Sequence, residues 1–155
     1  MSGVLFMSAR RRRQRTRAQA LAEFALVAPV FFLVLFAIVE AGRFMFYYET
    51  LNNATREGTR YAIVNGANSL GCSTGPAAPG TVSCDPSGDD VRDHVRNAAL
   101  GMPGSAIAVT PTWQPDNGRG SLVSVEATYT YSSLIPIVPL PAITVEAEST
   151  LVINN

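Results

Sequence analysis

Residues 24–39 read FALVAPVFFLVLFAIV and contain no polar side chain. Twelve of these sixteen residues are Phe, Leu, Val or Ile, and each favours bilayer insertion by about 0.3–0.6 kcal/mol. A span needs about 20 residues, so the preceding residues 20–22, with Glu23 at the interface, supply the missing length. The stretch predicts one membrane-spanning helix over residues 19–42. A buried helix of a soluble domain is the alternative, but four Phe without a charge would be unusual in so small a domain.

The charges around this segment predict its orientation. Six Arg lie between residues 10 and 17 without an acid, whereas the chain from residue 18 on has six Arg against twelve Asp and Glu, formally −6. The positive-inside rule places residues 1–18 in the cytoplasm as a basic leader. We therefore expect a single-pass protein of the cell (inner or plasma) membrane, with the chain after about residue 45 outside.

A cleaved secretory signal and a nucleic-acid-binding tail are the alternatives for the N-terminus. The tripeptide Val39-Glu40-Ala41 loosely resembles a signal-peptidase site, but the apolar run is longer than a typical signal core and the helical pattern continues past it. An Arg cluster also occurs in nucleic-acid-binding proteins. Beside a membrane span it favours anchoring, so no nucleic-acid partner is expected.

Residues 43–65 predict a helical extension outside the membrane, ending at Asn65-Gly66. Pro29 is a candidate kink earlier in the same helix, which is expected from about residue 18. One weakly apolar face recurs at spacings of three and four residues: Phe44, Tyr48, Leu51, Thr55, Gly58 and Ala62. Four aromatic residues stand where an interfacial belt is expected: Phe44, Phe46, Tyr47 and Tyr48.

Residues 66–155 predict a small extracytoplasmic domain. Turn residues dominate 66–88, which we expect to be a loop. Its two cysteines, Cys72 and Cys84, favour a local disulfide in an oxidising compartment, worth about 3 kcal/mol. A short helix is expected over about 89–100, capped by Ser87 or Asp89 and carrying an apolar stripe of Val91, Val95, Ala98 and Ala99.

Alternation of apolar and polar residues predicts three antiparallel strands, at about 105–113, 122–131 and 142–153. Asp116-Asn117-Gly118 marks the first turn, and a proline-rich connection over 133–141 precedes the last strand. The apolar faces are expected to be Ile107 and Val109, then Val123, Val125, Ala127, Tyr129 and Tyr131, and finally Ile143, Val145, Ala147, Leu151 and Ile153. The fold class is α+β: a long N-terminal helix, one short helix and a three-stranded sheet covered by helix.

The sequence shows no catalytic constellation. The single histidine, His94, is expected at the surface, because a triad or metal site needs partners that do not cluster. The run DPSGDDVRD over 85–93 lacks the spacing of a calcium loop. We therefore expect no enzyme activity, metal, cofactor or small-molecule substrate.

Glu23 stands at the edge of the apolar run, where an unpaired buried charge is costly. A first-turn Glu that favours the helix dipole and pairs with Arg17 or lipid headgroups is one possibility. A carboxylate drawn into the membrane and neutralised by a positive group on a partner is the second.

The run RAQALAEFALVAP over residues 17–29 resembles the start of TadE-like proteins, pseudopilins of tight-adherence (Flp-type) pilus assembly. Gly42-Arg43 and the block ATREGTRYA over 54–62 resemble the second block of that family. The resemblance implies cleavage by a prepilin-type peptidase between Ala18 and Gln19, where the family usually has Gly before the cut. It also implies pairing of Glu23 with the new amine of a neighbouring subunit.

The resemblance implies that Arg56, Gly58 and Arg60 form a helix motif used in assembly. The simpler interpretation is that Gly58 permits close helix packing and that the two Arg side chains are solvated. Expected partners are the membrane, other pilin-like subunits, Tad assembly proteins and a prepilin peptidase. The favoured hypothesis is a non-enzymatic pseudopilin-like component of a Tad (Flp) pilus or related secretion apparatus. An unprocessed, membrane-tethered binding or adhesion module is the alternative, and an exported enzyme the third class.

Overall fold

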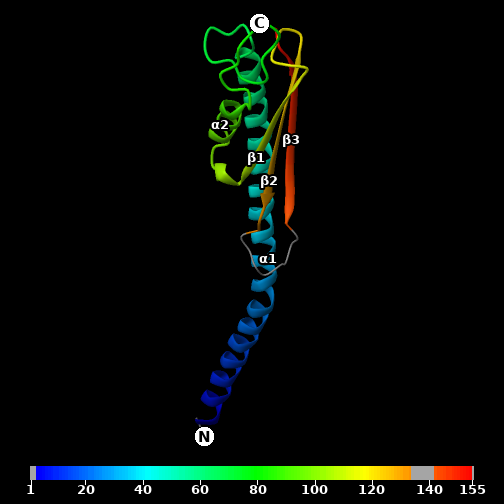
Figure 1. Cartoon of the computed structure of the whole chain (residues 1–155). Coiled ribbons are helices and arrows are strands. Elements are labelled where there is room, and N and C mark those ends of the chain that lie inside the picture. Colours follow the sequence, from blue (N-terminus) through cyan, green and yellow to red (C-terminus); the bar gives the residue numbers. More distant parts are fainter. Residues whose placement is uncertain (1–2, 134–141, 155) are drawn as a thin grey trace. The chain divides into compact units, whose positions relative to one another are not determined.

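The structure is a computed structural model that describes the backbone of residues 3–133 and 142–154, and side chains from residue 18 on within those ranges. Its elements are helix α1 (Gly3–Val64), helix α2 (Asp89–Ala98), the 3-10 turn η1 (Gly104–Ala106), and strands β1 (Ile107–Gln114), β2 (Leu122–Tyr131) and β3 (Ile143–Val152) (Figure 1). This is the predicted α+β fold. The predicted proline-rich connection lies, from residue 134 on, outside the described residues.

The chain divides into two compact units, Met1–Gly42 and Arg43–Asn155. The second unit contains both the predicted helical extension over 43–65 and the predicted domain over 66–155. The predicted borders of leader, membrane helix, extension and domain remain predictions.

Helix α1 begins at Gly3, well before the predicted start near residue 18, and continues as helix through Pro29. It ends at Val64, and the next residue still donates its backbone N–H to the Tyr61 carbonyl (3.1 Å). The early start follows from composition, because Arg and Ala are good helix formers and no Gly or Pro interrupts residues 4–28. The helical stop at Asn65-Gly66 is confirmed.

The sheet is antiparallel in the order β1-β2-β3. Its register places Val109 opposite Ala127, and Ala127 opposite Ala147, so that one apolar row crosses all three strands. The predicted inward face of β2 is buried throughout. On β3 the prediction is wrong at both ends of the strand, because Ile143 and Leu151 are exposed.

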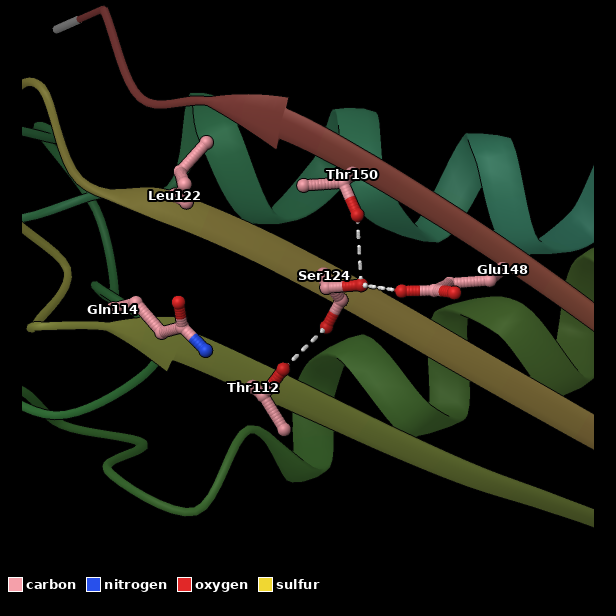
Figure 2. Close-up of a pocket in the computed structure, with 6 residues that line it drawn as sticks. All are labelled: Thr112, Gln114, Leu122, Ser124, Glu148 and Thr150. Carbon is pink, nitrogen blue, oxygen red and sulfur yellow. Dashed lines mark hydrogen bonds between the residues drawn. The ribbon is translucent and has the colours of Figure 1, made fainter.

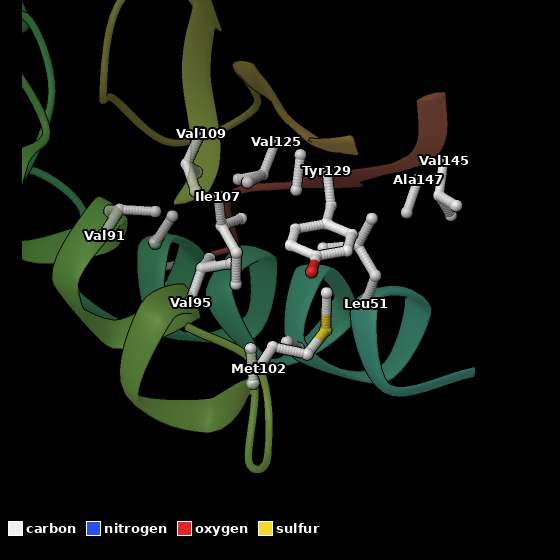
Figure 3. Close-up of a cluster of buried hydrophobic side chains, with 14 of the residues drawn as sticks. Leu51, Val91, Val95, Met102, Ile107, Val109, Val125, Tyr129, Val145 and Ala147 are labelled. Carbon is white, nitrogen blue, oxygen red and sulfur yellow. The ribbon is translucent and has the colours of Figure 1, made fainter. Parts of the chain in front are cut away.

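The hydrophobic core joins the sheet, α2 and the 43–64 part of α1 (Figure 3). From α1 the buried residues are Leu51, Ala54, Thr55, Gly58, Thr59 and Ala62, which confirms the outer part of the predicted face. Val91 and Val95 of α2 are fully buried against it. The threonines fit a helix interior because each hydroxyl donates to the carbonyl four residues earlier, at 2.7 Å for Thr55 and 2.8 Å for Thr59.

The predicted aromatic belt is divided by the structure. Tyr47, not Tyr48, packs on the sheet, edge-to-face with Tyr129 at 5.5 Å between ring centroids, and Phe44 packs in the same way on Tyr131. Tyr48 is exposed, as is Phe46. The face therefore shifts by one residue at its N-terminal end, and half of the predicted belt packs against the core.

The N-terminus of α2 is capped differently from the prediction. The N-cap residue is Gly88, in a left-handed conformation with φ 74°, and makes no side-chain cap. The carboxylate of Asp85 accepts instead from the backbone N–H groups of Asp89 (2.9 Å) and Asp90 (3.0 Å). Glycine is required at 88 for a second reason, because a Cβ there would lie 2.4 Å from the Trp113 ring.

Asn117, predicted as an ordinary turn residue, ties the long loop to the sheet. It is fully buried, its side-chain amide donates to the Thr74 carbonyl, and its side-chain oxygen accepts from the Ala78 N–H, both at 3.0 Å. Its backbone N–H and C=O also bond to Pro76 and Ala67. Asn117 therefore anchors four residues of the 66–88 loop, a segment that contains no helix or strand.

Candidate functional site

The apolar stretch of α1 is exposed along its length. The helical range Ala18–Val64 contains an 18-residue window of mean hydropathy 2.6, none of it buried. Within 24–39 the large apolar side chains are 40–75% exposed, far more than water tolerates on one contiguous surface. One helix of the described chain is thus long and apolar enough to cross a membrane.

Ala18, Gln19 and Glu23 all lie on this helix with exposed side chains. The predicted scissile bond, between Ala18 and Gln19, lies inside α1 and not in an extended segment. Gln19 and Glu23 are four residues apart, so they share one helix face. Their roles in cleavage and pairing stay predictions.

The structure separates the Arg56–Arg60 block into two parts. Gly58 is buried, and a Cβ added there would lie 2.2 Å from Cγ2 of Val95. Arg56 and Arg60 are exposed, and within the described residues neither side chain has a hydrogen-bond or ion-pair partner. Gly58 therefore serves the contact between α1 and α2, while the two Arg face outward.

His94 is less exposed than its predicted surface position suggests. Its ring stacks on Tyr61 of α1 at 4.5 Å between centroids, and its Nε2 lies 3.7 Å from a carboxylate oxygen of Glu57. The ring thus bridges α2 to α1 as a packing group. Among the side chains that the structure describes, no three metal-ligating residues gather into a site.

Cys72 and Cys84 form a disulfide, with their Cα atoms 5.6 Å apart. The acidic run beside them is engaged in structure. Asp85 caps α2, and Asp89 bonds to Ser87 and Arg92. The pKa of Asp89 is held below its ordinary value, first by the hydrogen bond from Ser87 and then by Arg92.

The exposed face of the sheet carries a shallow polar hollow, which sequence reasoning missed (Figure 2). It is lined by Thr112, Gln114, Leu122, Ser124, Glu148 and Thr150. The Ser124 hydroxyl donates to Glu148 (2.9 Å) and accepts from Thr150 (2.9 Å). These groups satisfy one another, and a serine beside a carboxylate without an imidazole lacks the usual base for nucleophilic catalysis. The alternation of β2 and β3 was the available signal, since it placed these residues on one face.

Comparison with known proteins adds one match. The family model described as TadE-like protein matches residues 18–60, which include the apolar helix, Glu23 and the Arg56–Arg60 block. No curated protein and no solved structure matched the chain. The matched segment ends within α1 and leaves the sheet outside. Over residues 18–60 this chain is therefore similar to TadE-like proteins, as the two sequence blocks predicted.

Proposed function

We propose that the chain is a non-enzymatic, pseudopilin-like structural component of a bacterial Tad (Flp) pilus or related secretion apparatus. The observation that carries the proposal is the TadE-like match over residues 18–60. That segment also contains the stretch 24–39 of α1, whose large apolar side chains are exposed. In a bilayer such a helix needs lipid or another helix beside it, and lateral packing of helices is a means of assembly.

In this proposal the chain is the substrate of a prepilin-type peptidase. Water hydrolyses the amide between Ala18 and Gln19, which leaves a carboxylate on Ala18 and a free α-amino group on Gln19. The basic leader departs with its six Arg. The new amine, protonated near neutral pH, is the positive group that Glu23 of a neighbouring copy would pair with, offsetting the cost of placing a carboxylate beside the apolar run.

N-terminal sequencing of the full-length protein recovered from membranes tests the processing. A chain beginning at Gln19 supports it. A chain beginning at Gly42 means cleavage as a secreted protein, and one beginning at Met1 or Met7 means a plain anchor.

Glu23→Ala tests the assembly role separately. We expect normal membrane insertion, because the apolar run is untouched, and at least a tenfold loss of assembled pili, about the value of one charge-assisted contact. Glu49→Ala is the matched control, since Glu49 is also exposed on α1 but lies outside the apolar run. Normal piliation in the Glu23 variant would rule the assembly role out.

A further inference from the structure

The exposed face of the sheet is acidic, because the three strands carry acidic side chains and no Arg or Lys. The three strands contain three charged residues, Glu126, Glu146 and Glu148, and all three are exposed. The register places Glu126 directly opposite Glu148. Like charges directly opposite each other in a sheet are destabilising, so this pair costs stability in the isolated chain.

A basic pair of matching size lies on the outside of α1. Arg56 and Arg60 are one turn apart, and like charges at this spacing also repel. Their Cβ atoms stand about 5–6 Å apart on helix geometry, and Cβ atoms of an opposed strand pair about 4.5–5.5 Å apart. The two like-charged pairs therefore match in spacing and are opposite in sign.

The two pairs do not meet within one copy. The helices pack on the buried face of the sheet, and Figure 2 shows Glu148 on the opposite face, with the helices behind. Within the described residues no ion pair joins these Arg to the sheet.

We propose that Arg56 and Arg60 of one copy bind Glu126 and Glu148 on the sheet of a second copy of this chain. The two surfaces differ, so the contact is head-to-tail, and repetition generates a helical filament unless the rotation closes. The inference deepens the proposed assembly function and rests on it. It is independent of leader cleavage and of Glu23.

Charge exchange in the full-length protein tests the contact. Two differently tagged copies are co-expressed, solubilised in mild detergent at low salt and co-purified through one tag. Arg56→Glu with Arg60→Glu, or Glu126→Arg with Glu148→Arg, is expected to lower self-recovery about tenfold, since two exposed ion pairs are lost. Raising the salt should weaken recovery of the unchanged protein in the same way.

Two further combinations of variants restore opposite charges at the contact and decide the test. The two double variants should recover each other, because every helix-to-sheet contact between them again joins opposite charges. A chain with all four reversals should recover itself but not the unchanged protein. Arg119→Glu, an exposed reversal outside both pairs, should behave as unchanged protein.

Equal recovery of all variants would overturn the contact and mean that the apolar helices alone hold copies together. Loss in both double variants without recovery between them would also overturn it, because the two charged pairs would then not contact each other. Either result leaves the sequencing test of the proposed function standing.

Discussion

Replacing Gly58 by Ala should destabilise the second unit, although alanine is the better helix former. An added Cβ would lie 2.2 Å from Cγ2 of Val95, far inside contact distance. Val95 is fully buried, and a helical valine strongly prefers one χ1 rotamer, so its methyl group has little room to move. Overpacking of this kind costs about 1–3 kcal/mol, and the gain in helix propensity returns about 1 kcal/mol.

The net loss of about 1 kcal/mol corresponds to a fall in Tm of about 4–8 °C. The assay is thermal unfolding of the full-length protein in detergent, followed by the fluorescence of its single tryptophan, Trp113, in the second unit. Gly42→Ala is the control, because it makes the same change on α1 with no heavy atom within 4 Å.

The close approach of the two helices also predicts that substitutions at positions 58 and 95 are coupled. Val95→Ala removes the obstructing methyl groups, so the double variant with Gly58→Ala should lose about 1–3 kcal/mol less than the sum of the single changes. A Gly58→Ala protein that melts at or above the unchanged protein would refute the packing role. Strict additivity of the two changes would do the same.

Three more predictions concern the loop and α2. Asn117→Ala should cost about 2–4 kcal/mol, because the buried Thr74 carbonyl and the part-buried Ala78 N–H lose their partners. Asn52→Ala, which removes only an exposed hydrogen bond to the Tyr48 carbonyl, should change Tm by little, and equal effects would contradict the role of Asn117. Replacing Cys72 and Cys84 by Ser should cost about 3 kcal/mol on the chain-entropy model, and a Tm insensitive to reductant in the unchanged protein would contradict it. The pKa of Asp89 is lowered in the folded state, so this residue stabilises the fold above its ordinary pKa. That stabilisation is lost as the pH falls through the folded pKa. Below about pH 4 the Tm of the unchanged protein should therefore fall slightly more than the Tm of the Asp89→Asn variant. Parallel curves of Tm against pH for the two proteins would exclude the effect.

The parts of the fold that could be predicted from the sequence are those in which apolar residues recur at regular spacing. Alternation over 122–131 placed every inward residue of β2 correctly, and the helical spacing from Leu51 to Ala62 identified the buried face of α1. The same spacing failed at Tyr48, where the side chains of Tyr129 and Tyr131 receive Tyr47 instead. A periodic pattern defines a stripe on a helix, but the partner surface decides how far the stripe is covered.

The parts that it missed are held by single long-range contacts. Asp85 caps α2 from three residues before the N-cap, because Gly88 turns the chain back on itself, whereas a capping side chain usually belongs to the N-cap residue itself. Asn117 bonds to a carbonyl 43 residues away. No local spacing encodes such a contact, and a buried asparagine in a turn looks in sequence like any exposed one.

The Arg56–Arg60 block shows why a motif and a site are different things. In the sequence it is one run of residues, and the TadE-like match includes all of it. On the helix its residues separate, because about 100° of rotation per residue sends Gly58 to the α2 side and both Arg to the solvent side. The two functions are therefore separable by substitution. A change at Gly58 should lower Tm and affect association only through folding, whereas reversal of the Arg pair should reduce association at unchanged Tm. If the Arg variants unfolded as readily as the Gly58 variant, the outward pair would belong to the fold and not to a contact between copies.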